Sequence, residues 1–131
     1  MATIFKEFSV AAAPGAVWAA FKDVGAVDKL AKGFVTATRM AEPDTRIVTF
    51  ANGMEARETI VSVDDARKRL AYWINRNERL IHHNGVFEVF ADGAGSRVTW
   101  TVDLLPDEMA GPIGGMMDMG AAAMRESLGG G

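Results

Sequence analysis

The stretch GVFEVFADGAGSRVTWTVDL, residues 85–104, decides the fold of this chain. Both halves are rich in β-branched and aromatic residues, which favour strands. The segment DGAGS between them is typical of a hairpin turn. In the second half, Val98, Trp100 and Val102 alternate with polar residues, so one face of the strand is apolar. The stretch therefore predicts two antiparallel strands with one buried face.

The sequence upstream of this hairpin shows the same organisation. Between residues 34 and 74, the apolar segments FVTATRM, RIVTFA, EARETIVSV and KRLAYWI are separated by turn sequences, of which Asn52-Gly53 is the strongest. Residues 3–10 also alternate and predict a strand at the start of the chain. We therefore expect seven strands in an antiparallel sheet.

Helical periodicity appears after the first strand and at the end of the chain. Pro14 is well placed at a helix start, and Val17, Trp18 and Phe21 share one helical face. A second short helix is expected within residues 25–33. These two elements separate the first strand from the rest of the sheet.

The last helix is predicted by apolar residues that recur every three or four positions after Pro106. Five of the eight methionines in the chain fall between Met109 and Met124. Glycines at the front of this segment weaken its helix propensity, so we expect residues 109–117 to form a mobile lid. A long antiparallel sheet needs cover on one face, and this helix is the sizeable element that can supply it.

Composition limits the classes of protein to consider. The chain has 131 residues, 49% of them hydrophobic and 24% charged, as expected for one globular domain over residues 1–128 with a glycine tail at 129–131. The net charge of -3 and the scattered basic residues argue against nucleic-acid binding. We expect no membrane span and a cytoplasmic location, because no apolar run is long enough and no signal peptide is evident. The absence of cysteine excludes disulfides and thiolate chemistry.

Three stretches, FSVAAAPGAVWAAFKDV (8–24), RETIVSVDDARKRLAYWI (57–74) and residues 85–104, together resemble the START-like or SRPBCC superfamily. Within it, the chain is similar to small bacterial proteins of the polyketide cyclase/dehydratase type. The resemblance implies an α+β helix-grip fold. In it, a seven-stranded curved antiparallel sheet, with two short helices after strand 1, packs against a long C-terminal helix over an internal cavity. It further implies that the cavity holds a small hydrophobic molecule, such as a lipid or polyketide.

The two histidines of the chain, His82 and His83, are adjacent. Successive side chains of a strand point to opposite faces, so the pair cannot share one metal ion without a bulge. His83 has the same parity as Phe87 and Val89, which places it towards the cavity and His82 towards solvent. His83 is then either a hydrogen-bonded wall residue or a general acid/base. No metal site and no cofactor are implied.

Other candidate site residues follow from the same parity argument. Tyr72 and Trp100 are expected to face inward, and the hydroxyl of Tyr72 would need a buried partner. Arg57 lies in the predicted strand EARETIVSV, whose later residues are apolar at both sets of alternating positions. The alternation therefore does not decide whether the Arg57 side chain faces the cavity or solvent. Arg57 would hold an anion if it faces inward, and it would join a surface ion pair if it faces outward.

The predicted function is binding of a small, largely apolar molecule by a carrier or sensor that is monomeric or homodimeric. The predicted ligand-binding residues are Phe34, Phe50, Ile74, Phe87, Trp100, Met109, Ile113, Met116 and Met117. An alternative is a cyclase, dehydratase or isomerase without metal, in which His83 or Tyr72 transfers protons and Arg57 stabilises an anion. A further alternative is a co-chaperone-like interaction protein with an exposed apolar patch.

Overall fold

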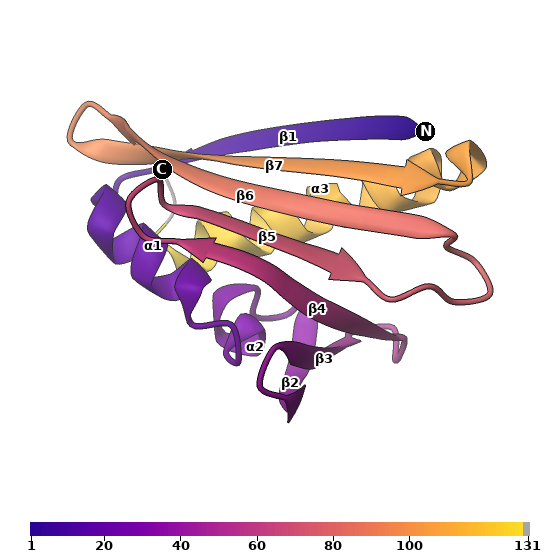
Figure 1. Ribbon diagram of the computed structural model, residues 1–131. Helices are drawn as coiled ribbons and strands as arrows, with labels where there is room; N and C mark the ends of the chain where they lie inside the picture. Colours follow the sequence, from indigo (N-terminus) through magenta and orange to yellow (C-terminus); the bar gives the residue numbers. More distant parts are fainter. Residues whose placement is uncertain (130–131) are drawn as a thin grey trace.

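The computed structural model describes residues 1–129, in which seven strands form one curved antiparallel sheet (Figure 1). The strands are β1 (Ala2–Val10), β2 (Val35–Glu42), β3 (Thr45–Phe50), β4 (Glu55–Asp64), β5 (Arg69–Ile74), β6 (His82–Asp92) and β7 (Gly95–Leu105). The helices are α1 (Pro14–Lys22), α2 (Val27–Leu30), the 3-10 turn η1 (Asp107–Met109) and α3 (Ala110–Ser127). The predicted α+β helix-grip fold is confirmed. Residues 130 and 131 of the predicted glycine tail lie outside the described part.

The order of strands in the sheet is β1-β7-β6-β5-β4-β3-β2. Strands β2 to β7 follow one another as a meander, whereas β1 pairs with the last strand, from Ala2 opposite Leu104 to Val10 opposite Ser96. The stretch 85–104 forms most of the β6–β7 hairpin, which stays in register from its turn to His82 opposite Leu105. This hairpin joins β1 to the remainder of the sheet.

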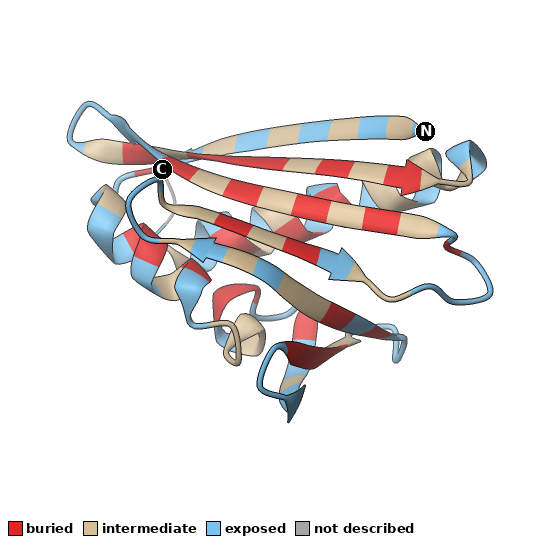
Figure 2. Cartoon of the chain, in the orientation of Figure 1, coloured by how far each residue is buried: buried red, intermediate tan, exposed pale blue. Residues whose placement is uncertain are grey.

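Burial alternates along the central strands, as Figure 2 shows for β5, β6 and β7. In β6 the buried positions run from His83 to Val89 in steps of two, and in β7 the fully buried residues include Val98 and Val102. One face of the sheet therefore carries the core.

Helix α1 packs one end of this core. Its buried residues are Val17, Trp18 and Phe21, the face that the sequence predicts, and the Phe21 ring lies 4.8 Å from that of Phe87 between centroids. The indole of Trp18 donates a hydrogen bond to Asp65 beyond β4 at 2.9 Å. The helix is thereby tied to the β4–β5 turn.

Helix α3 covers the same face of the sheet through Met117, Gly120 and Met124. A Cβ atom at Gly120 would lie 3.2 Å from both the Phe34 ring and the Trp100 ring, so glycine lets the helix approach these aromatic side chains closely. The front of the segment is helical from Ala110 onwards, and its mobility remains a prediction. Among the described residues, no helix is long and apolar enough to cross a membrane.

Candidate functional site

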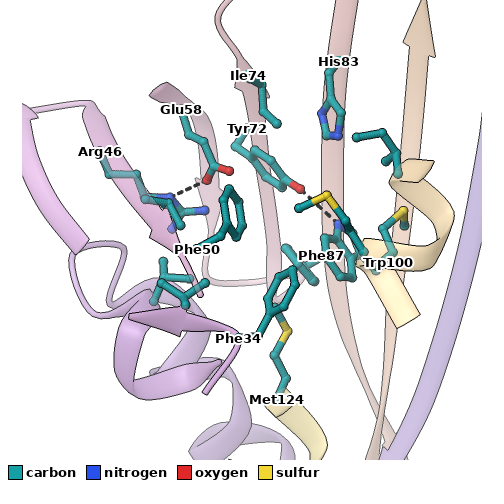
Figure 3. Close-up of a pocket in the computed structure, with 16 residues that line it drawn as sticks. Phe34, Arg46, Phe50, Glu58, Tyr72, Ile74, His83, Phe87, Trp100 and Met124 are labelled. Carbon is teal, nitrogen blue, oxygen red and sulfur yellow. Dashed lines mark hydrogen bonds and ion pairs between the residues drawn. The ribbon is translucent and has the colours of Figure 1, made fainter. Parts of the chain in front are cut away.

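An interior pocket of about 80 Å³ lies between α3 and the sheet (Figure 3). It is lined by Val27, Phe34, Val35, Arg46, Val48, Phe50, Glu58, Tyr72, Ile74, His83, Phe87, Trp100, Ile113, Met116, Met117 and Met124. Eight of the nine predicted ligand-binding residues are in this set, and so are Tyr72 and His83. The walls are mostly aromatic and aliphatic, with a few polar groups, as is typical of small-molecule sites.

Tyr72 occupies the middle of the pocket wall. Its phenol oxygen accepts a hydrogen bond from the Trp100 indole at 3.1 Å, and its ring stacks on Phe87 at 5.9 Å between centroids. The residue opposite it in β6 is Gly85, where a Cβ would stand 2.4 Å from the Tyr72 ring. Burial, reinforced by the charge of Glu58, raises the pKa of Tyr72 above its ordinary value. The phenol is therefore neutral and keeps its own proton available for donation.

His83 lies beside Tyr72, with 6.1 Å between the two ring centroids, and its residue is 4% exposed. Its Nδ1 atom is buried and has no hydrogen-bond partner among residues 1–129. His82 points to the other face of β6, where its Nε2 pairs with the Asn84 side chain. Burial lowers the pKa of His83 to about 4, so the imidazole is neutral at pH 7.

The burial of the neutral His83 imidazole should make the free energy of unfolding depend on pH. Because the pKa of His83 falls from 6.5 to about 4 on folding, the unfolded chain binds the proton first as the pH drops. We expect wild-type protein to lose up to about 3 kcal/mol of unfolding free energy between pH 6.5 and 4, relative to His83→Gln. Urea titrations of both proteins across this range measure the difference. Equal pH profiles would contradict the burial of a neutral imidazole.

A buried ion pair, which the sequence did not reveal, lines the pocket beside Tyr72. Arg46 Nε donates to Glu58 Oε1 at 2.8 Å, and the two side chains are 5% and 9% exposed. Arg46 also donates to the Val24 carbonyl oxygen at 3.2 Å, and its guanidinium lies 5.6 Å from the Tyr72 ring centroid. The two residues are directly opposite in the β3–β4 hairpin. If the residues on either side of the predicted Asn52-Gly53 turn are paired in order, Arg46 and Glu58 come close together on neighbouring strands.

Two predicted site residues lie outside the pocket. Arg57 is exposed and pairs with Glu42 at 2.9 Å on the other face, because its strand neighbours Ala56 and Glu58 point inward. Its hypothesised role as an anion-binding residue is therefore wrong, and the surface ion pair is the correct alternative. Met109 ends η1 and packs against the core without lining the pocket.

The fold and the pocket define a helix-grip protein of the START-like class. The chain belongs to the family described as polyketide cyclase/dehydrase and lipid transport, which matches residues 1–130. No curated protein matches the chain.

Solved structures show the same fold. XoxI from Bacillus cereus is 17% identical with a TM-score of 0.85, over 98% of this chain and 96% of that chain. Ara h 8.0201 is 17% identical with a TM-score of 0.76, over 97% of each chain. A Thermobifida fusca protein is 28% identical with a TM-score of 0.76, over 98% of this chain and 94% of its own.

Proposed function

We propose that this protein binds a small, largely apolar molecule in the interior pocket, as a carrier or sensor. The observation that carries the proposal is the composition of the pocket. Aromatic, aliphatic and methionine side chains form most of its wall, which also includes Tyr72 and His83, whose buried Nδ1 has no partner among residues 1–129. Buried polar groups without partners are costly, so a ligand that satisfies them gains affinity and orientation.

The acid-base chemistry of the pocket favours binding over catalysis. A general acid or base works best when its pKa is near the working pH. Burial moves the pKa of His83 down to about 4 and the pKa of Tyr72 upwards, so neither group is well matched to proton transfer near neutral pH. The alternative of a cyclase, dehydratase or isomerase is supported by the proximity of these two side chains. It requires a bound substrate that raises the pKa of His83 and lowers the pKa of Tyr72.

The interaction-protein alternative is supported by exposed apolar side chains. Phe5 is 54% exposed and Trp73 is 47% exposed. Their cross-strand neighbours are polar, however: Thr101 lies opposite Phe5, and Thr59 and Asn84 lie on either side of Trp73. Polar residues therefore lie directly opposite both aromatic side chains, which favours the interior pocket as the functional site.

The proposed function is tested by filling the pocket. Protein purified from its own host is examined by native mass spectrometry for bound small molecules, together with Ile113→Trp and the matched control Gly115→Trp. Ile113 lines the pocket, whereas Gly115 has nothing within 4 Å of its Cβ position. We expect wild type and Gly115→Trp to carry the same molecule and Ile113→Trp to lose it. Retention of the molecule by Ile113→Trp, or no bound molecule in any of the proteins, would contradict the proposal.

A further inference from the structure

The interior pocket is smaller than the sites in which proteins usually bind small molecules. Its volume is about 80 Å³, whereas small-molecule sites are usually about 300–1,000 Å³. A second hollow, the outer groove, has a volume of about 570 Å³. It lies between α3 and two facing segments, residues 32–34 before β2 and residues 50–52 at the end of β3.

The two hollows share a wall. Phe34, Phe50 and Met116 line both the interior pocket and the outer groove. The two phenylalanine rings contact each other with 5.3 Å between centroids, and all three residues are only half-buried. Met116 belongs to the glycine-containing front half of α3 and has a flexible, unbranched side chain. These three side chains therefore separate the two hollows, and a movement of them would join the hollows.

Most of the groove wall along α3 is apolar. Met119, which is 58% exposed, and the small residues Ala122 and Ala123 lie there beside the charged Glu126, and the opposite side carries Lys32 and Asn52. An exposed methionine between small residues offers a hydrocarbon chain both contact area and space. The interior pocket, in contrast, contains the polar groups of Tyr72 and His83. The two hollows thus suit the two ends of one amphipathic molecule.

The charges of the interior pocket determine which polar end it can take. Its charged side chains in the described chain are Arg46 and Glu58, which neutralise each other at 2.8 Å. The phenol of Tyr72 is neutral and can donate a hydrogen bond, because its oxygen already accepts one from Trp100. An anionic head group would enter without a free countercharge, and burying an unpaired charge is costly. A carbonyl or hydroxyl oxygen fits these groups.

We propose that the ligand site is bipartite and takes a neutral amphipathic molecule, with its oxygen-bearing end at Tyr72 and His83 and its apolar tail in the outer groove. Phe34, Phe50 and Met116 form the neck between the two parts. This inference rests on the proposed function and extends it by naming the class of ligand and its direction.

A series of methyl ketones tests the inference by NMR titration. 2-Butanone is short enough to remain in the interior pocket, and 2-nonanone is long enough to pass the neck. Each methylene buried in the groove should tighten binding about fourfold, so we expect 2-nonanone to bind at least about a hundredfold more tightly than 2-butanone. Nuclear Overhauser contacts should join the methyl group beside the carbonyl to Tyr72 and the terminal methyl group to Met119 or Ala122.

Variants and a charged probe separate the possible outcomes. Ala122→Trp blocks the groove, and Gly115→Trp places the same side chain on α3 outside both hollows. We expect Ala122→Trp to weaken 2-nonanone by at least about tenfold without affecting 2-butanone, and Gly115→Trp to affect neither. Decanoate should bind at least about tenfold more weakly than 2-nonanone.

Three results would overturn the bipartite site while the interior pocket remains a binding site: equal affinity for both ketones, no effect of Ala122→Trp on 2-nonanone, or tighter binding of decanoate. If neither ketone shifts resonances of pocket residues, the proposed function itself is contradicted.

Discussion

Glu58→Leu alone should lower the free energy of unfolding by about 3–5 kcal/mol, because it leaves the Arg46 guanidinium buried without its counterion. The two side chains are only 5% and 9% exposed, so bulk solvent compensates poorly for the lost partner. Chemical denaturation followed by circular dichroism measures the change. The double variant Arg46→Met with Glu58→Leu removes both charges and should recover most of the loss, since apolar residues can replace a buried pair with little cost.

The matched comparison is the exposed ion pair between Arg57 and Glu42 in the same part of the sheet. Glu42→Leu should change stability by about 1 kcal/mol or less, as is usual for surface pairs. Similar effects of Glu58→Leu and Glu42→Leu would contradict the burial of the Arg46–Glu58 pair. So would a double variant that is as unstable as Glu58→Leu.

Gly85→Ala should destabilise the protein by about 2–4 kcal/mol and disturb the pocket. The added Cβ would stand 2.4 Å from the Tyr72 ring, which must move and release its hydrogen bond to Trp100. Gly15→Ala is the control, because its Cβ position in α1 has nothing within 4 Å. It should leave stability unchanged or raise it by up to about 1 kcal/mol. Denaturation and tryptophan fluorescence report both effects.

A double-mutant cycle identifies the cause of the Gly85→Ala effect. In a Tyr72→Leu background the clashing ring atoms are absent, so Gly85→Ala should become neutral or stabilising by about 0.5–1 kcal/mol, because alanine loses less backbone entropy than glycine. A cost that is unchanged in the Tyr72→Leu background would show that contact with Tyr72 is not the reason for glycine at this position.

The sequence predicted the strands and helices well because their apolar periodicity is strong. The faces of β6 and β7 could be assigned from alternation alone, and this placed Trp100, Phe87 and His83 on the inner side. The face of Arg57 could not be assigned. The residues after Thr59 are apolar at both sets of alternating positions, and a bulge between Ile60 and Ser62 shifts the register of β4 against β5.

The polar part of the pocket was the least predictable from the sequence. A charged residue such as Arg46 or Glu58 is usually exposed, and its inward direction depends on a partner in the neighbouring strand. The size of the pocket also depends on how α3 sits on the sheet, which is set by contacts such as Gly120 with Phe34 and Trp100. The periodicity within one strand or helix does not show which residues pair across neighbouring strands or how closely a helix packs on the sheet.

The pairing of β1 with β7 has a consequence for biosynthesis. Residues 2–10 are synthesised well before their partners, residues 96–104. The sheet can be completed only after residues 96–104 have left the ribosome, and until then β1 remains without its neighbour. Such distant pairing is slow relative to local structure formation and leaves apolar side chains uncovered. Nascent chains truncated before residue 96 should therefore depend on chaperones, whereas the full-length chain closes its own sheet.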